Sequence, residues 1–443
     1  RRGPGARTAA GSAAAARRPP VTAAPVAPAP ATAAPSLPET VTAPPRDAAR
    51  TAVVLLLVAS TVGWRRGEYF AGSVDPVVAA KGLLSLLALA GAFALATSGP
   101  PRRLGTGSVW FLAVLLSGSV LGALTHGTLV ASTLVAVRVA VLATTVLLLL
   151  RASTTGQFFR SLSWACGAVG LVAAVTGLPS LSTGRLAGGV PPLSPNELAL
   201  LGGVVVAHTA WRTVLGEAGW RSALAGIGAL AVIWETGSRT GLLMLLVGVA
   251  VTGLHLRRAR VGLVVTGLLL AGLGVLGVVG TGAVSGFAER GGDGTSTLQS
   301  RFIAWRASLS WAHSVWQQVL GGGLSVKEIP VKGQWWHTQP LDSSWVSALV
   351  QTGALGLVVA AVWVLWALRG AWHAPRPQRA LLLGLLVYLL GRSVLESGLF
   401  DATPAFLAFF AASLLCEGAS RERLADDLRS DPIAAPSPAR SPS

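Results

Sequence analysis

Long apolar segments separated by short polar turns constrain the fold of this chain more than any other feature of its sequence. A transmembrane helix needs ~20 mostly apolar residues to cross the hydrocarbon core of a bilayer. Apolar residues make up 52% of the chain and charged residues 12%, about half the charged fraction of a typical soluble domain. The sequence therefore predicts an all-α polytopic membrane protein and excludes a soluble enzyme. Twelve segments are candidate spans: residues 50–64, 75–97, 107–124, 128–150, 160–178, 195–211, 221–236, 239–256, 261–281, 343–368, 380–398 and 402–417.

Positively charged residues predict how these twelve segments are oriented. If the N-terminus is cytoplasmic, 23 of the 35 Lys and Arg residues lie on the cytoplasmic side and 9 lie in outer loops. Lys81, Arg138 and Arg392 fall inside the spans. Cytoplasmic loops of membrane proteins carry an excess of Lys and Arg, so we expect both termini in the cytoplasm. The same rule accounts for the net charge of +17 without a nucleic-acid partner.

Composition divides the chain into five parts. Residues 1–46 are rich in Ala and Pro and predict a disordered cytoplasmic tail. Residues 47–281 hold the first nine spans, 282–342 form one long extracytoplasmic loop, 343–417 hold the last three spans, and 418–443 form a second disordered cytoplasmic tail.

The long outer loop is expected to contain one amphipathic helix. Apolar residues recur in it at helical spacing, and polar residues including Arg301 and Ser308 occupy the opposite face. Such a helix suits a position on the membrane–water boundary or a cap over the bundle of spans. The apolar positions are Leu298, Phe302, Trp305, Leu309, Ala312, Trp316 and Val319.

The sixth span begins with a helix cap on the outer side. A motif at residues 184–188, which contains Arg185, precedes Ser194-Pro195-Asn196-Glu197. Ser194 and Glu197 have capping-box spacing, and Pro195 suits the first helical position. The N–H groups at this helix start would point outward and favour an anion.

The eighth span also starts on the outer side, at Gly237-Ser238-Arg239-Thr240-Gly241. Ser238 is predicted to be the N-cap, which places Arg239 beside the positive end of the helix. Arg301 on the loop helix and Arg185 before the sixth span are expected to join Arg239. Because one guanidinium can donate two parallel hydrogen bonds to two phosphate oxygens, these three arginines predict a binding site for the phosphate or diphosphate of a lipid. The alternative is that these arginines only anchor the protein at the membrane boundary.

His337, just before the tenth span, is the candidate base. An imidazole can accept a proton near neutral pH, and Asp342, five residues further on, could orient it. The alternative is a structural histidine in a Trp-rich boundary. Asp401 and Arg138 are supporting candidates because ionisable residues at membrane depth are often functional. Glu396 lies one helical turn from Arg392, so those two residues could simply pair.

The sequence contains neither an HExxH motif nor a Cys/His cluster, so we predict neither a metal site nor a cofactor. Cys166 and Cys416 lie far apart in apolar runs and indicate no disulfide framework.

In order along the chain, these segments resemble the O-antigen ligase and Wzy polymerase-like family of membrane glycosyltransferases. The resemblance covers about residues 50–417 and rests on several short motifs. They are Gly184–Gly188 leading to Pro195-Asn196-Glu197-Leu198-Ala199, Gly237-Ser238-Arg239-Thr240-Gly241-Leu242-Leu243, Arg301-Phe302-Ile303-Ala304-Trp305 leading to Gly321-Gly322-Gly323, and His337 leading into Gln351-Thr352-Gly353-Ala354-Leu355-Gly356-Leu357. The family often has Asn after the histidine, where this chain has Thr338.

The resemblance implies a GT-C-like helical bundle in a bacterial plasma membrane, with the site on the outer face and the long loop closing it. It implies a glycan donor on undecaprenyl diphosphate and a glycan or glycolipid acceptor. Carried over, Arg239 and Arg301 would bind the donor diphosphate with Arg185 beside them, and His337 would be the general base. Asn196 and Ser238 would support the site in a metal-independent, inverting transfer.

Three alternatives remain open at this point. A Wzy-like polymerase has the same motifs as a ligase. A transporter or flippase of lipid-linked substrates suits twelve spans and the central Arg138, although the sequence shows no two-half repeat. The third is a structural subunit without activity.

Overall fold

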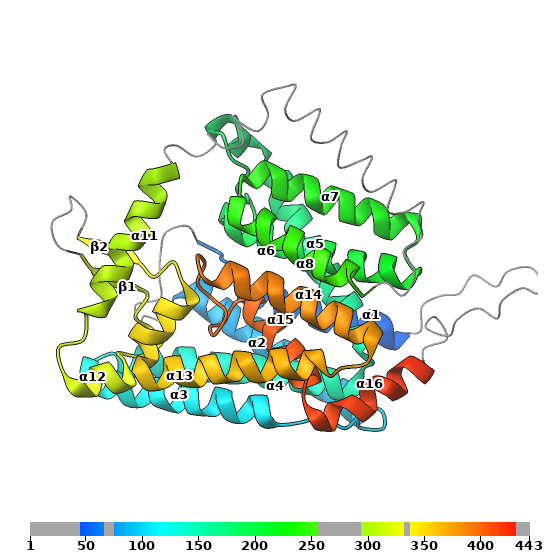
Figure 1. The fold of residues 1–443 in the computed structure, drawn as a ribbon, viewed down its shortest axis with the longest axis horizontal. Coiled ribbons are helices and arrows are strands. Elements are labelled where there is room, and N and C mark those ends of the chain that lie inside the picture. Colours follow the sequence, from blue (N-terminus) through cyan, green and yellow to red (C-terminus); the bar gives the residue numbers. More distant parts are fainter. Residues whose placement is uncertain (1–44, 66–74, 256–293, 332–336, 431–443) are drawn as a thin grey trace, which may run out of the picture. The chain divides into compact units, whose positions relative to one another are not determined.

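The computed structural model describes residues 45–65, 75–255, 294–331 and 337–430 (Figure 1). These residues belong to one compact unit, Pro44–Ser443. Residues 1–44 of the predicted N-terminal tail, the span at 261–281 and parts of the outer loop lie outside the described residues, whereas residues 45 and 46 of the predicted tail belong to a helix. The helices of the first half are α1 (Pro45–Thr61), α2 (Pro76–Thr97), α3 (Gly107–His126), α4 (Leu129–Ala152), α5 (Thr155–Thr176), the 3-10 helix η1 (Leu178–Thr183), α6 (Pro195–Leu215), α7 (Trp220–Thr236) and α8 (Arg239–Gly253).

The second half adds helices and one small hairpin. The two short strands pair antiparallel, with Ile329 opposite Gln339, and no pattern in the sequence predicts them. The elements are α11 (Gly294–Leu309), α12 (Val315–Leu320), β1 (Glu328–Pro330), β2 (Thr338–Pro340), α13 (Ser344–Trp372), α14 (Arg376–Ser393), α15 (Pro404–Leu415) and α16 (Gly418–Ser430).

Six of these helices, namely α2, α3, α4, α5, α6 and α13, are long and apolar enough to cross a membrane. The chain is therefore a helical membrane protein, as predicted. The described residues do not show twelve spans, because α8 and α15 are shorter apolar helices and α1 and α7 have only 17 residues each. The boundaries of the predicted segments nevertheless agree with observed helix ends to within a few residues at α2, α3 and α4.

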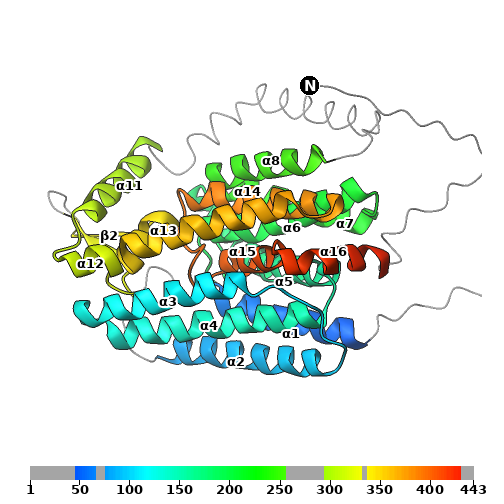
Figure 2. The same cartoon turned by 60° about the horizontal axis from the view of Figure 1, so that its bottom comes forward.

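The apolar core is centred on α15, all 12 residues of which are buried. Helices α13 and α14 and the α3–α4 pair contact this short helix, and Figure 2 shows it between them. Trp363 of α13 packs edge-on against Phe409 of α15, with ring centroids 4.9 Å apart. Aromatic pairs at this spacing contribute ~0.5–1.5 kcal/mol beyond the burial of their area. Helix α15 is therefore enclosed by its neighbours along its whole length.

The predicted loop helix is broken in two, which corrects the expectation of one helix over residues 298–319. Helix α11 ends at Leu309, and α12 starts after Ser314, whose side chain accepts a hydrogen bond from the Gln317 N–H. Between them Trp311 turns inward, with 9% of its surface exposed, into a small second core with Ile329 and other residues of the hairpin region. Burial of this indole outweighs the continuation of the helix.

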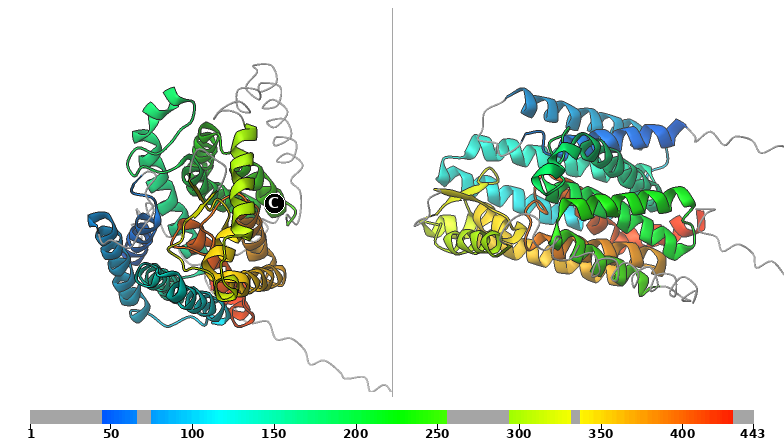
Figure 3. Two further views of the ribbon diagram at one scale, coloured as in Figure 1. Left: turned by 90° about the vertical axis from the view of Figure 1, so that its left-hand side faces the viewer. Right: turned by 90° about the horizontal axis from the view of Figure 1, so that it is seen from above.

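Helix α11 presents its apolar side outward. Phe302 and Leu309 are 54% and 77% exposed, whereas Ser308 is buried and Arg301 points toward the bundle. Figure 3 (left) looks onto the end of the bundle that carries α11, α12 and the hairpin.

Helix α13 is broken near its start, where another segment approaches it closely. Gly353 has a left-handed backbone (φ 68°), a conformation that glycine adopts without strain. The break exposes carbonyl groups of α13, which accept hydrogen bonds from the Gly322 N–H (2.9 Å, to Val350) and the Gly323 N–H (3.0 Å, to Gln351). The loop after α12 is therefore joined to α13 through the backbone.

At the opposite end the structure corrects a second prediction, because residues 418–430 form helix α16 rather than a disordered tail. Glu417, just before it, accepts hydrogen bonds from the N–H groups of Gly107 (2.8 Å) and Ser108 (2.7 Å) at the start of α3. Asp427 accepts one from the Thr155 N–H (2.9 Å) at the start of α5. Carboxylates stabilise helix N-termini, so the C-terminal segment caps two other helices.

Candidate functional site

Two predicted outer motifs lie side by side. The Arg185 Nε donates a hydrogen bond to the Thr236 carbonyl at 2.9 Å. The adjacent Leu186 N–H donates to the Glu235 carbonyl, also at 2.9 Å. These two bonds join residues 184–188 to the end of α7, directly before the turn that carries Arg239.

The N-termini of α6 and α8 also meet here. The capping box predicted for α6 is confirmed, since Ser194 and Glu197 each accept a hydrogen bond from the other's backbone N–H. Ser238 occupies the N-cap position of α8, but its side chain makes no capping hydrogen bond. A Cβ atom added at Gly241 would lie 3.5 Å from the Cβ of Ala199. Two helix starts that favour anions are therefore adjacent.

Arg301 reaches this region from α11. Its Nη2 donates to Glu396 Oε1 at 3.2 Å, and its Nε lies 3.9 Å from Asp342 Oδ2. Asn196, on the first turn of α6, donates from Nδ2 to the same Glu396 oxygen at 2.6 Å. A single carboxylate therefore joins α11 to the start of α6.

Electrostatic interactions extend this group to the other two predicted arginines. Burial lowers the pKa of Arg185, Glu396 raises it, and the positive charges of Arg239 and Arg301 lower it. Since Arg185 interacts with both arginines, the fold brings all three together. We call Arg185, Arg239, Arg301 and Glu396 the arginine cluster.

Glu396 is the member of this cluster whose role the sequence did not reveal. It follows α14, and the turn-spaced pair with Arg392 was the simplest interpretation. Instead, the Arg392 Nη2 donates to the Asn196 carbonyl at 2.6 Å, while the Glu396 carboxylate binds Arg301 and Asn196. Burial raises the pKa of Glu396, and the nearby charges of Arg392 and Arg301 lower it, with a net upward shift.

His337 lies directly before β2 and has an exposed side chain. Its carbonyl accepts a hydrogen bond from the Val331 N–H at 3.0 Å. The predicted contact with Asp342 is not formed between these two described residues, because β2 keeps the chain between them extended at about 3.3 Å per residue. Asp342 instead lies beside Arg301, and burial raises its pKa while Arg301 lowers it.

Asp401 and Arg138 belong to a second polar group. Asp401 forms an ion pair with Lys327, a residue that nothing in the sequence marked as functional. Arg138, in α4, donates a hydrogen bond to the Ser60 carbonyl and interacts electrostatically with Asp401. Lys81 of α2 interacts with both Arg138 and Asp401. The supporting residues predicted as one set therefore divide between two neighbouring groups.

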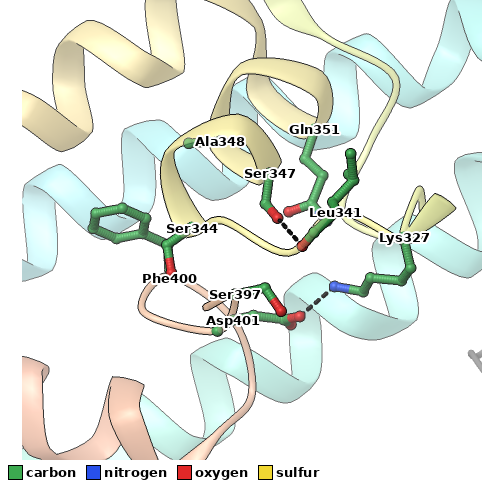
Figure 4. A pocket seen from close by; sticks show the side chains of 10 residues that line it. Lys327, Leu341, Ser344, Ser347, Ala348, Gln351, Ser397, Phe400 and Asp401 are labelled. Carbon is green, nitrogen blue, oxygen red and sulfur yellow. Dashed lines mark hydrogen bonds and ion pairs between the residues drawn. The ribbon is translucent and has the colours of Figure 1, made fainter. Parts of the chain in front are cut away.

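A polar pocket of about 40 Å³ adjoins the Lys327–Asp401 pair. Figure 4 shows both side chains at its edge, below Ser347 and Gln351 of α13. Its lining residues are Lys327, Leu341, Ser344, Ser347, Ala348, Gln351, Ser397, Gly398, Phe400 and Asp401.

No protein-family model and no curated protein matches this chain. Within the described ranges, no three His, Cys, Asp or Glu residues lie together as a group that could hold a metal ion.

The arginine cluster has three positive charges and one negative charge, and it lies at two helix N-termini. Guanidinium groups and helix N-termini both bind phosphate oxygens. The chemistry that this arrangement supports is therefore recognition of a phosphate or diphosphate, and stabilisation of negative charge that develops on it.

Proposed function

We propose that this protein is a membrane glycosyltransferase that moves a glycan from undecaprenyl diphosphate to an acceptor hydroxyl at the outer face of a bacterial plasma membrane. The observation that carries the proposal is that Arg185 interacts electrostatically with Arg239, Arg301 and Glu396 beside the starts of α6 and α8, and that Arg301 binds Glu396 directly. Arginines that only anchored the boundary would have no reason to converge on one another across three separate segments.

The proposed reaction is a single displacement. The acceptor oxygen attacks the anomeric carbon, the bond from that carbon to the phosphate oxygen breaks, and undecaprenyl diphosphate leaves. Arginines and helix dipoles stabilise the charge of the leaving group. The acceptor proton passes to His337, and a base in this position typically contributes 10²–10⁴-fold to the rate. Attack opposite the leaving group inverts the anomeric configuration, and no metal is required.

The proposed function requires a topology in which the arginine cluster lies on the outer side of the membrane. Helices α1, α7, α8, α14 and α15 would cross the bilayer together with the six long helices, and the twelfth predicted span, 261–281, lies outside the described residues. With twelve spans and the predicted excess of positive charge in cytoplasmic loops, both termini would be cytoplasmic, and Arg185, Arg239 and Glu396 would lie on the outer side.

Reconstitution of the purified chain tests the function. We expect the wild type to transfer glycan from an undecaprenyl-diphosphate oligosaccharide in the presence of EDTA. The variants Arg239→Ala, Arg301→Ala and His337→Ala should remain folded and lose transfer. Full activity in all three variants would contradict the assignment. A ladder of lengthening products would indicate a polymerase, and one transfer to a distinct acceptor would indicate a ligase.

A transporter of lipid-linked substrates is the second candidate. It is favoured by Lys81 and Arg138, charged residues within the long apolar helices α2 and α4, since such residues often mark a substrate pathway. Movement of labelled lipid-linked glycan across sealed vesicles, without a new glycosidic bond, would support it.

A further inference from the structure

The pocket beside Lys327 and Asp401 is linked to the arginine cluster by two pairs of consecutive residues. Leu341 lines the pocket, and the next residue, Asp342, lies beside Arg301. Ser397 lines the pocket, and the preceding residue, Glu396, binds Arg301. Consecutive Cα atoms are about 3.8 Å apart, so two ligands, one in the cluster and one in the pocket, would lie next to each other.

Ser344 stabilises the segment between the pocket and the arginine cluster. Its Oγ donates to the Glu396 carbonyl at 2.8 Å and accepts from the Leu399 N–H at 3.1 Å. It also lines the pocket. The loop between α14 and α15 is thereby fixed with Glu396 toward the arginines and Ser397 toward the pocket.

The two sites differ in charge. The arginine cluster has an excess of positive charge, whereas the pocket has one cation and one anion that pair with each other. Burial raises the pKa of Asp401, but the Lys327 ammonium and the Ala402 N–H lower it by more, to a net value below the ordinary one. Asp401 therefore remains ionised and acts as a hydrogen-bond acceptor rather than as a base.

The pocket offers both donors and acceptors to a neutral ligand. Lys327 supplies an ammonium, and the Gln351 amide donates to the Val326 carbonyl at 2.8 Å. No described residue donates to the side-chain oxygen Oε1 of Gln351, and Figure 4 shows Gln351 next to Ser347 above the pocket. A hydroxyl group both donates and accepts hydrogen bonds, so it fits this lining better than an ion does.

We propose that this pocket binds a hydroxyl or hydroxymethyl group of the acceptor sugar and thereby determines which acceptor is used. The inference rests on the proposed function. A volume of about 40 Å³ admits one or two groups of the size of a water molecule. The pocket can therefore hold one hydroxyl or hydroxymethyl substituent of a sugar but not a whole sugar ring. The acceptor would then lie beside the diphosphate site, where its reacting hydroxyl can meet the anomeric carbon of the donor.

A thiol-protection experiment tests the pocket directly. The two native cysteines, Cys166 and Cys416, are both buried, so Ser397→Cys introduces one accessible thiol at the exposed edge of the pocket. Ser182→Cys, on the exposed 3-10 helix η1, is the matched control. The full chain in nanodiscs is labelled with a small maleimide in the presence of methyl glucoside, of methyl xyloside, which lacks the hydroxymethyl arm, or of no sugar.

We expect methyl glucoside to slow labelling of the Ser397→Cys variant at least threefold and saturably, to leave Ser182→Cys unchanged, and to act more strongly than methyl xyloside. No slowing, or equal slowing of both variants, would overturn the proposal. Protection by undecaprenyl diphosphate alone would also overturn it, because the pocket would then belong to the donor.

A second variant separates this inference from the proposed function. Ser397→Leu fills the edge of the pocket, and we expect it to reduce glycan transfer at least tenfold while leaving the affinity for undecaprenyl diphosphate unchanged. Unchanged transfer would overturn the acceptor pocket alone. Failure of the wild-type protein to bind undecaprenyl diphosphate would overturn the proposed function instead, whatever the thiol labelling shows.

Discussion

The Arg301 guanidinium donates a hydrogen bond to the Glu396 carboxylate at 3.2 Å, across 95 residues of sequence. Both side chains are largely shielded from solvent, with 12% and 17% of their surface exposed. Glu396 thus supplies the negative charge in a group of residues that is otherwise suited to bind a diphosphate. A phosphate that enters the cluster must share Arg301 with this carboxylate or displace it.

We therefore expect Glu396→Gln to bind diphosphate more tightly than the wild type does. A unit charge ~4 Å from the ligand contributes about 4 kcal/mol at an effective dielectric constant of 20, and rearrangement offsets part of this energy. A gain of roughly tenfold, or about 1.4 kcal/mol, is the expected result. Calorimetric titration with pyrophosphate measures it. Glu328→Gln, at an exposed position on β1, is the matched control and should have the affinity of the wild type.

The pH dependence of diphosphate binding should depend on the ionisation of the Glu396 carboxylate. The pKa of Glu396 lies above its ordinary value of 4.5, chiefly because of burial. As the pH falls through this raised pKa, Glu396 loses its charge and the cluster becomes more positive. We expect the affinity for a disubstituted diphosphate, which does not itself titrate in this range, to rise as the pH approaches 4.5 from above. Glu396→Gln should show a much smaller rise, and an equal rise in both proteins would assign the effect to another group.

The raised pKa of Glu396 should also affect the stability of the fold. A carboxyl group with a raised pKa in the folded state stabilises the fold fully below its ordinary pKa, and this contribution is lost as the pH rises through the folded-state pKa. Between pH 4.5 and neutral pH, Glu396→Gln should therefore change from nearly neutral to stabilising relative to the wild type. Thermal unfolding of both proteins across this range measures the difference, and a constant difference would contradict it.

The C-terminal segment should contribute to stability through its two caps. Glu417 accepts hydrogen bonds from two N–H groups at the start of α3 and is 6% exposed. Loss of a helix cap costs about 0.5–2 kcal/mol, and an unsatisfied buried donor costs about 1–3 kcal/mol. We expect Glu417→Ala to reduce the unfolding free energy by about 2 kcal/mol. Glu417→Gln, which keeps one acceptor, should lose less, and equal losses would show that the carboxylate does not cap α3.

Local sequence patterns predicted those parts of the fold that depend only on residues close together in the chain. The apolar runs located α2, α3 and α4, because a bilayer span has a fixed length. The spacing of Ser194 and Glu197 identified the start of α6, because a capping box involves only four consecutive residues. Both kinds of information are contained within a few turns of one helix.

Tertiary contacts account for what the sequence did not reveal. Trp311 breaks the loop helix because a separate small core holds its side chain, and no local pattern indicates that core. The polar composition after Glu417 is typical of a tail, yet Glu417 and Asp427 stabilise helices that start about 310 and 272 residues earlier in the chain. The ion pair between Lys327 and Asp401 joins residues 74 positions apart, and no local pattern relates these two residues to each other.

Equilibrium binding of undecaprenyl diphosphate to the purified full chain and to Arg301→Ala, with Arg306→Ala as the control on the same helix, tests whether the arginine cluster is a diphosphate site. Arg306 is exposed and lies outside the arginine cluster. We expect the wild type and Arg306→Ala to bind equally and Arg301→Ala to bind at least tenfold more weakly. Equal binding by all three proteins, or no binding by the wild type, would contradict the proposal that the arginine cluster is a diphosphate site.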